Sequence, residues 1–265
     1  MLKFNIVSTG NELLSGRTLD FNSNWLARRI NSLGGVLQQI TVVHDEAYQI
    51  ISAIRQAMAL GPDIIITTGG LGPTPGDITL DALAEALSIK LHQDELAVDM
   101  VKTRLEFLWK NGFIDTPEMS PERSKMAMIP LGSTPLFNPI GVAPGVLTES
   151  GRTHVISLPG VPSEMMGIFE TYVPILLKQI AFEGVHVERE IYVDEKDESI
   201  LAAILKLVMN EVQGVNIKSF MQGYGSYLRT TVVLSTNANS INEGEKKIQS
   251  AIKSLENRLN YEGQK

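Results

Sequence analysis

The chain of 265 residues contains no cysteine and only four histidines. The absence of cysteine excludes disulfides, thiolate nucleophiles and zinc–thiolate sites. The histidines are widely spaced along the sequence, at His44, His92, His154 and His186. A histidine-rich metal site is therefore not expected, and any bound metal should be held by oxygen ligands, as magnesium is.

An excess of positive charge and a long apolar run are also missing. The formal net charge is −7, whereas proteins that bind nucleic-acid backbones usually have a basic excess. No apolar run is long enough to span a membrane, and the N-terminus runs into a strand-like segment without a signal peptide. We therefore expect a cytoplasmic enzyme or binding protein with neither nucleic acid nor membrane as a partner.

The first half of the sequence alternates between strand-like and helix-like patterns. Leu26, Ile30 and Leu33 recur at i, i+4 and i+7, as on one face of a helix. The pattern predicts strands at 4–8, 36–43 and 63–67 and helices at 22–33, 47–60 and 78–88. Strands that alternate with helices indicate an α/β fold with a mostly parallel sheet covered on both sides. Ligands in such folds bind at the carboxyl ends of the strands.

The second half predicts a mainly helical stretch over 93–127 with a break, and short strands within 136–158. A long helix is expected over 163–181. Beyond it, residues 187–259 follow the pattern β-α-β-β-α, which is typical of a compact separate unit. We therefore expect two domains, residues 1–184 and 185–265, joined near Glu183 and Gly184.

The most informative segment is the glycine-rich loop between the strand at 63–67 and the helix at 78–88. Gly69, Gly70 and Gly72 allow a sharp turn and a close approach to a ligand. The helix N-terminus behind them offers N–H groups and a positive dipole end, which favour phosphate. Asp77 stands where this helix is expected to begin. The segment indicates an anion or nucleotide site, although a tight turn with Asp77 as a helix N-cap is the simpler alternative.

Two other strand ends supply polar residues at the same predicted edge of the sheet. Asp45 follows the strand at 36–43 and, together with Asp77, could bind one divalent cation or polarise a water. The alternative is that Asp45 caps the helix that begins near Tyr48. After the first strand, Gly10 permits a turn and Asn11 and Glu12 can make polar contacts, unless this is an ordinary βα loop.

Three further groups have both a functional and an architectural interpretation. Asn22 precedes or opens a helix and is explained by capping alone. Asn138, in a rigid loop that continues to Gly145, could read a base or a ribose. The turn from Pro159 to Glu164 offers a second helix N-terminus to a phosphate or carboxylate.

Four motifs follow one another along the sequence, and the ordered set is specific enough to indicate a family. They are Gly10-Asn11-Glu12-Leu13-Leu14, Thr68 to Thr74 with Asp77 and Thr79, Asn138 to Gly145 with Gly141, and Leu158-Pro159-Gly160-Val161-Pro162-Ser163-Glu164-Met165. The set resembles the N-terminal part of the competence/damage-inducible protein A family, which belongs to the molybdopterin-binding superfamily. The resemblance covers essentially the whole chain, because residues 185–260 are similar to the small unit that follows in that family.

The resemblance implies a three-layer α/β/α fold and a metal-dependent ADP-ribose pyrophosphatase that produces AMP and ribose 5-phosphate. The cofactor would be a divalent metal: magnesium, manganese or cobalt. Asp45 and Asp77 match acidic residues that matter for chemistry in related molybdopterin adenylyltransferases, so we expect them to be catalytic and to bind the metal. Our hypothesis is a hydrolase of nucleotide diphosphates; the alternatives are a molybdopterin-binding protein and a non-catalytic nucleotide-binding protein.

The resemblance also assigns a wider set of residues to phosphate or nucleotide binding. The set comprises Thr68, Gly69, Gly70, Leu71, Gly72, Pro73, Thr74, Gly10, Asn11, Glu12, Asn22, Asn138, Pro159, Gly160, Ser163 and Glu164.

The sequence departs from the family pattern in two places. Many members have two consecutive aspartates in the glycine motif, whereas this chain has Gly76 before Asp77. Bacterial members often continue into a nicotinamide-mononucleotide deamidase domain, and deamidation is not expected of this chain. The family further implies a homo-oligomer, for which the sequence indicates no interface.

Overall fold

The computed structural model describes residues 2–180, 185–194, 197–222 and 229–262. The chain divides into two compact units. One unit comprises Leu2–Ile30 and Val36–Phe182, and the other comprises Met1, Asn31–Gly35 and Glu183–Lys265. The expected junction at Glu183 and Gly184 lies outside the described residues.

A six-stranded sheet forms the centre of the larger unit. Its strands, in spatial order, are β2 (Val36–Val43), β1 (Lys3–Thr9), β3 (Ile64–Thr68), β8 (Thr153–Leu158), β7 (Gly145–Ser150) and β6 (Thr134–Leu136). Pairing is parallel from β2 through β8, and β7 is antiparallel to both of its neighbours. The predicted α/β class with a mostly parallel sheet is therefore confirmed.

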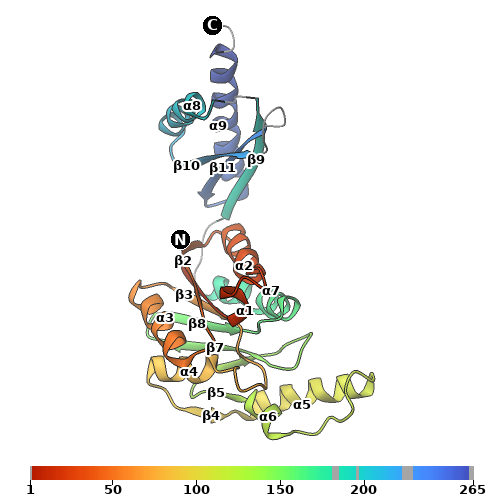
Figure 1. Cartoon of the computed structure of the whole chain (residues 1–265). Coiled ribbons are helices and arrows are strands. Elements are labelled where there is room, and N and C mark those ends of the chain that lie inside the picture. Colours follow the sequence, from red (N-terminus) through yellow and green to blue (C-terminus); the bar gives the residue numbers. More distant parts are fainter. Residues whose placement is uncertain (1, 181–184, 195–196, 223–228, 263–265) are drawn as a thin grey trace. The chain divides into compact units, whose positions relative to one another are not determined.

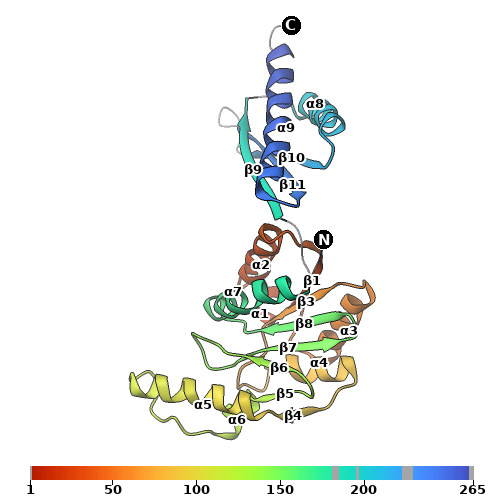
Figure 2. The ribbon, with the colours of Figure 1, turned by 180° about the vertical axis from the view of Figure 1, so that it is seen from behind.

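Helices cover both faces of this sheet, as Figures 1 and 2 show. The helices α2 (Phe21–Ser32) and α7 (Pro162–Gln179) lie on one face, and α3 (Ala47–Ala59) and α4 (Thr79–Leu87) lie on the other. Trp25 of α2 meets Phe169 of α7 edge to face, with ring centroids 5.4 Å apart. The arrangement is the expected three-layer α/β/α fold.

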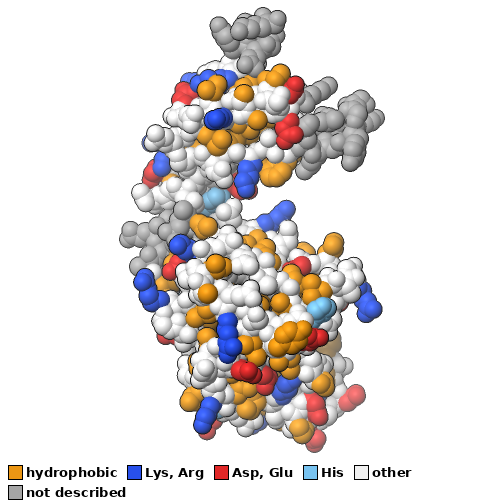
Figure 3. Space-filling model, turned by 60° about the vertical axis from the view of Figure 1, so that its left-hand side comes forward, with side chains coloured by type: hydrophobic (Ala, Val, Ile, Leu, Met, Phe, Trp, Pro, Cys, Tyr) orange, Lys and Arg blue, Asp and Glu red, His pale blue; other side chains and the backbone are white. Residues whose placement is uncertain are grey.

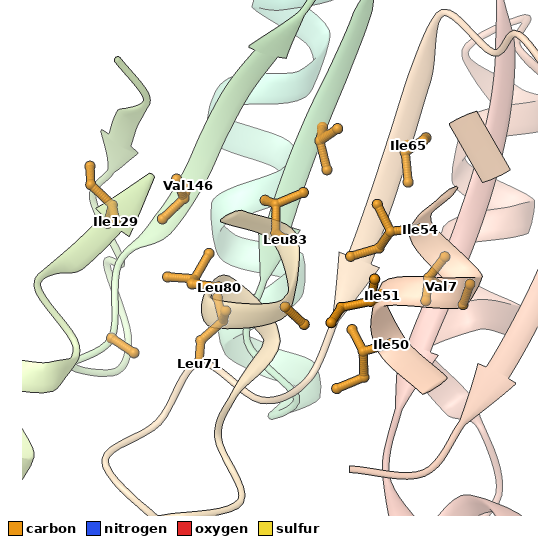
Figure 4. Close-up of a cluster of buried hydrophobic side chains, with 14 of the residues drawn as sticks. Val7, Ile50, Ile51, Ile54, Ile65, Leu71, Leu80, Leu83, Ile129 and Val146 are labelled. Atoms are coloured by element: carbon orange, nitrogen blue, oxygen red, sulfur yellow. The ribbon is translucent and has the colours of Figure 1, made fainter. Parts of the chain in front are cut away.

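The hydrophobic core on the α3–α4 side reaches the glycine-rich loop, as the close-up in Figure 4 shows. Ile65 of the central strand and Leu83 of α4 are fully buried there. Leu71 of the glycine-rich loop enters the same cluster and is only 5% exposed. Burying a leucine side chain contributes about 1.5–3 kcal/mol. Leu71 therefore anchors the loop to the core, and the neighbouring backbone is held in place.

The segment between α4 and the last strands of the sheet contains more β-structure than the sequence predicted. Besides α5 (Glu95–Lys110) and α6 (Pro121–Lys125), it forms β4 (Leu91–Gln93) and β5 (Met128–Pro130), which pair antiparallel. Asp94 caps α5 by accepting from the Ala97 N–H at 2.8 Å. The mainly helical prediction for 93–127 is therefore confirmed by α5 and α6, with the expected break between them, whereas the two short strands at its ends were not predicted.

The smaller unit follows the predicted β-α-β-β-α order. Its elements are β9 (Val185–Val193), α8 (Glu198–Glu211), β10 (Val215–Gln222), β11 (Arg229–Ala238) and α9 (Ile241–Glu262). The strands form an antiparallel sheet in the order β10-β11-β9. Both helices bury apolar side chains against one face of it, among them Leu201 and Ile248.

No helix among the described ranges is long and apolar enough to cross a bilayer. On the face shown in Figure 3, acidic and basic side chains are interspersed, and no large patch of one sign stands out.

Candidate functional site

The carboxyl ends of four strands meet at one edge of the large sheet. The chain leaves β1 toward β2 on one side, whereas it leaves β3 toward β8 on the other. The crevice between β1 and β3 is therefore a topological switch point, where ligands of open α/β sheets bind. A cavity of about 710 Å³ opens there, and its lining includes Gly10, Asp45, Gly69 to Thr74, Asp77 and Gly160.

The first two glycines of the loop occupy backbone conformations that other residues rarely adopt. Their φ angles are 102° at Gly69 and 69° at Gly70. A Cβ at Gly69 would stand 2.5 Å from the carbonyl oxygen of Thr9, and one at Gly70 would overlap the Thr79 hydroxyl. The Thr79 hydroxyl donates to the Gly69 carbonyl at 2.8 Å, and the backbone N–H of Thr79 donates to the Gly70 carbonyl at 3.1 Å. Both glycines are thus required for the loop to close over Thr79.

This loop presents backbone donors to the cavity. Among the described residues, the N–H groups of Gly70, Leu71 and Gly72 have no hydrogen-bond partner, and all three residues line the cavity. Successive free N–H groups form a concave site for an anion. The Thr79 N–H at the start of α4 is already used by Gly70. The donors are therefore offered by the loop itself, ahead of the helix N-terminus to which the sequence argument assigned them.

Asp77 closes the same loop. Its Oδ2 accepts from the N–H of Thr74 at 2.8 Å and from the Thr74 hydroxyl at 2.6 Å. The N-cap of α4 is Ile78, which makes no side-chain cap bond. The interpretation of Asp77 as a helix N-cap is therefore wrong. Lys125 of α6 adds a hydrogen bond to the Thr74 carbonyl at 2.7 Å.

Asp45, two residues after the end of β2, lines the same cavity. Its Oδ2 accepts from the N–H of Asn11 at 3.0 Å, at the start of the short helix α1 (Asn11–Leu14). The N-cap of α3 is Glu46, so the alternative in which Asp45 caps that helix is also wrong. Asn11 does not line the cavity; its Oδ1 accepts from Nδ1 of His44 at 2.8 Å, a partner that the sequence did not suggest.

The two aspartates line one cavity, as the metal hypothesis requires. Each carboxylate accepts a backbone hydrogen bond through Oδ2, from the N–H of Asn11 for Asp45 and from the N–H of Thr74 for Asp77. Within the described ranges, no group of three or more histidine, aspartate and glutamate side chains could hold a metal ion. The donor set fits a cation of the magnesium type only when phosphate oxygens or water complete the coordination, which is usual for magnesium.

The cavity lining also includes Gly10, Glu12 and Gly76. The Glu12 carboxylate lies against Gly10, where a Cβ would stand 2.5 Å from Oε1. A Cβ at Gly76 would meet no atom closer than the Thr74 hydroxyl, at 3.9 Å. Position 76 therefore has room for a Cβ.

Asn22 and Thr68 lie behind the cavity wall and do not line it. Nδ2 of Asn22 donates to the Thr68 hydroxyl at 2.9 Å and to the Gly160 carbonyl at 2.8 Å. The Thr68 hydroxyl donates in turn to the Pro159 carbonyl at 3.1 Å. Both residues are buried. They join β3 to the turn before α7, and the structure gives them a bracing role where the sequence predicted direct ligand contact.

The turn before α7 approaches the glycine-rich loop closely. A Cβ at Gly160 would stand 3.3 Å from Cα of Gly69, and Pro159, Gly160 and Glu164 line the cavity. Ser163 does not line it. Glu164 lies in the first turn of α7 and places negative charge at the positive end of that helix. This charge disfavours a phosphate at this end of α7, and the phosphate or carboxylate site expected there stays a prediction.

Asn138 organises the loop beside Glu164. It is 1% exposed and donates to Oε2 of Glu164 at 2.7 Å and to the Ala143 carbonyl at 2.9 Å. Its Oδ1 accepts from the N–H groups of Ile140 and Gly141. Asn138 does not line the cavity, so the predicted role of reading a base or ribose is not supported.

The Glu164 carboxyl is half-buried in this setting. Burial raises its pKa, and the hydrogen bond from Asn138 and the charge of Arg104 oppose that shift. Arg104 is itself buried and donates to the carbonyl oxygens of Ile140 and Gly141. Asn138 therefore holds the Glu164 carboxylate, and Arg104 holds the loop of Ile140 and Gly141 against which that carboxylate lies.

The cavity also has an apolar wall, which was not predicted from the sequence. This wall comprises Leu105, Leu108, Ile114, Met126, Ile140 and Val142. Leu105 and Leu108 are spaced at i and i+3 on α5, a pattern that also marks ordinary core residues. Arg123 of α6 adds a positive charge to the lining. The cavity thus has a donor-rich end at the glycine-rich loop and an apolar wall formed by α5, α6 and the loop after Asn138.

The fold and the strand-end cavity define an α/β domain built around a small-molecule type of site. Residues 5–179 match the family model described as "Probable molybdopterin binding domain". The match spans well over half of the chain, and the chain belongs to this family.

The chain is also similar to proteins of known sequence and to one solved structure. A protein of Pyrobaculum aerophilum is 43% identical over 219 residues, which cover 83% of this chain and 79% of the relative. A protein of Pyrococcus horikoshii is 37% identical over 223 residues, covering 84% and 86%. The crystal structure of the protein CinA from Thermoplasma acidophilum, described as of unknown function, is 31% identical with a TM-score of 0.59. It covers 67% of this chain and 98% of its own.

Proposed function

We propose that this chain binds a phosphorylated pterin of the molybdopterin type in the strand-end cavity. The observation that supports this most is the row of free N–H groups at Gly70, Leu71 and Gly72. Such a row binds phosphate oxygens without needing a charged side chain. Membership of a probable molybdopterin-binding family points to the rest of the ligand.

The two ends of the cavity suit the two parts of such a molecule. The phosphate lies on the glycine-rich loop, and the flat ring packs against the apolar wall, where Leu105, Met126 and Val142 supply hydrophobic contact. A volume of about 710 Å³ is in the range of pockets that enclose a small molecule.

The test is an equilibrium titration of the purified chain with molybdopterin, followed through the pterin fluorescence. We expect saturable binding that pyrophosphate displaces, because both ligands need the same N–H row. Sodium chloride at matched ionic strength is the control for simple screening. Absence of saturable binding, or binding that pyrophosphate does not displace, would contradict the proposal.

A second candidate is the metal-dependent hydrolysis of a nucleotide diphosphate such as ADP-ribose. Its support is that Asp45 and Asp77 line the same cavity as the N–H row. In this reaction water adds to one phosphorus and the P–O–P bridge breaks, giving AMP and ribose 5-phosphate. A divalent cation bound there would supply positive charge to the phosphate oxygens. Asp45 and Asp77 would hold it or orient the attacking water, and the loop N–H groups would stabilise the developing charge.

Chromatography of products separates the two candidates. The chain is incubated with ADP-ribose, with and without magnesium, manganese or cobalt. Metal-dependent release of AMP, lost in Asp77→Asn, would support the hydrolase and show that Gly76 does not abolish it. Ligand-induced thermal stabilisation without AMP release, with each of these metals, would support binding without hydrolysis.

A further inference from the structure

Glu164 differs from the other acidic residues of the cavity in its position. Glu12, Asp45 and Asp77 belong to the strand-end loops around the proposed phosphate site, whereas Glu164 comes from α7. Its carboxylate lies directly against Gly141, beside Ile140 and Val142 of the apolar wall. A negative group at this point repels phosphate, so the part of the ligand that meets it must be a hydrogen-bond donor.

The carboxylate is fixed in this position by its neighbours. Asn138 donates to Oε2 at 2.7 Å, and the absence of a side chain at Gly141 leaves the space that both carboxylate oxygens occupy. Arg104 holds the carbonyl of Gly141 at 2.8 Å from its Nε. A carboxylate can accept about four hydrogen bonds, so one from Asn138 leaves capacity for a ligand.

The chemistry of the two ends limits the kind of ring that fits. The apolar wall accepts the face of a planar heterocycle, and a carboxylate at its edge pairs best with two adjacent N–H donors. A 2-amino-4-oxopyrimidine edge, which pterin and guanine share, has a ring N–H next to an amino group. Adenine presents one donor beside one acceptor, which a carboxylate cannot match.

On the basis of the proposed function, we propose that Glu164 recognises the 2-amino-4-oxopyrimidine edge of the ligand. Glu164 thereby selects pterin or guanine rings over adenine. Asn138 and Arg104 act as positioning residues, since they hold the carboxylate and the loop against which it lies. The half-buried carboxylate is only partly solvated by water. It therefore gains hydrogen-bond donors when the ligand binds.

Three nucleoside diphosphates that share the phosphates and ribose test this inference. GDP has the complete edge, IDP lacks only the 2-amino group, and ADP has the mismatched edge. We expect the wild-type chain to bind GDP at least about 10-fold more tightly than IDP or ADP, the usual effect of a hydrogen bond to a charged group. Calorimetric titration of each ligand gives the three dissociation constants.

The variant Glu164→Gln keeps an oxygen for Asn138 but turns an amide N–H₂ toward the ligand. We expect it to lose the preference for GDP over IDP while still binding all three through the glycine-rich loop. Glu149→Gln, at an exposed position of β7 outside the cavity lining, removes the same charge and should leave the preference intact. Equal affinity of the wild type for all three ligands, or an unchanged preference in Glu164→Gln, would overturn the inference.

A fourth ligand distinguishes a pterin ring from a guanine ring. The full set of ligands distinguishes failure of the proposed phosphate site from failure of the role of Glu164. The pyrophosphate ester of 6-hydroxymethyl-7,8-dihydropterin is titrated beside GDP. Tighter binding of the pterin identifies the pterin ring, and tighter binding of GDP identifies guanine; either result supports recognition of the shared edge. If pyrophosphate and all four ligands fail to bind, the proposed phosphate site is wrong and the inference falls with it. If ADP binds most tightly, only the role of Glu164 is wrong.

Discussion

Thr74 donates twice to the same oxygen of Asp77, from its N–H at 2.8 Å and from its hydroxyl at 2.6 Å. The carboxylate that the sequence marks as a metal ligand is therefore also the residue that closes the phosphate loop. Replacing it by alanine would remove a charge and open the loop together. Variants that separate these two effects are needed.

Asp77→Asn and Thr74→Val form such a pair. The asparagine keeps an oxygen for Thr74 and loses the charge, whereas the valine keeps the charge and loses one hydrogen bond. If Asp77 holds a cation during hydrolysis, Asp77→Asn should lower metal-dependent AMP release by at least about 100-fold. Thr74→Val should lower it by less than about 10-fold, in line with a net hydrogen bond of about 1 kcal/mol. Equal losses would assign Asp77 to loop closure alone.

Gly70→Ala should destabilise the chain strongly. The φ angle of 69° is unfavourable for alanine, and the new Cβ would overlap the Thr79 hydroxyl. We expect a loss of at least about 2 kcal/mol of unfolding free energy, measured by urea denaturation. Gly76→Ala is the control in the same loop, because its Cβ meets nothing closer than 3.9 Å. It should change stability by no more than about 0.5 kcal/mol, the range of ordinary surface substitutions. Similar losses at both positions would contradict the account of the loop.

Asn22→Ala should cost about 1–3 kcal/mol of unfolding free energy. It removes the donor shared by the Thr68 hydroxyl and the Gly160 carbonyl and leaves both without that partner. Asn24→Ala, at an exposed position of the same helix, is the matched control. If Asn22 instead contacts the ligand from a tolerant site, its variant would lose affinity with unchanged stability.

The half-buried carboxyl of Glu164 should make stability depend on pH in a particular way. Burial raises its pKa in the folded chain above the ordinary value of 4.5. Between the ordinary and the raised value, the folded chain keeps a proton that the unfolded chain has lost, so stability falls as the pH rises. Glu164→Gln lacks this group. The difference in unfolding free energy, variant minus wild type, should therefore increase as the pH rises from 4.5 through the raised pKa. Above that pKa the difference should level off. Denaturation at a series of pH values measures this, and a constant or decreasing difference would contradict it.

Much of the fold followed from local patterns in the sequence. The apolar run Ile64–Ile66 fits a strand covered on both faces. The glycines that follow this strand, and Gly160 after Leu158, mark turns at the same sheet edge. Because parallel strands deliver their carboxyl ends to one edge, Asp45 and Asp77 could be placed near each other without knowing any distance. The pairing of β4 with β5 was missed, since it joins short segments far apart in the sequence.

The direction of each polar side chain was harder to predict. Asn22 and Asn138 stand beside the motifs and look like ligand-binding residues, but both point into the protein and bond to backbone carbonyls. Asparagine satisfies buried backbone groups as readily as it binds a ligand, and only tertiary packing decides between these uses. Leu105 and Met126 were missed for the converse reason, because an apolar residue at the edge of a core and one that lines a cavity have the same sequence pattern.

The most direct test of the central claim is an NMR titration of the chain, with its 22 glycines isotope-labelled at nitrogen, against pyrophosphate. We expect saturable chemical-shift changes that are largest for the amides of Gly70 and Gly72, which line the cavity as free donors. Gly151, in the hairpin turn between β7 and β8, should remain unshifted. Unshifted Gly70 and Gly72 amides, or larger shifts at distant glycines, would show that the loop is not the phosphate site.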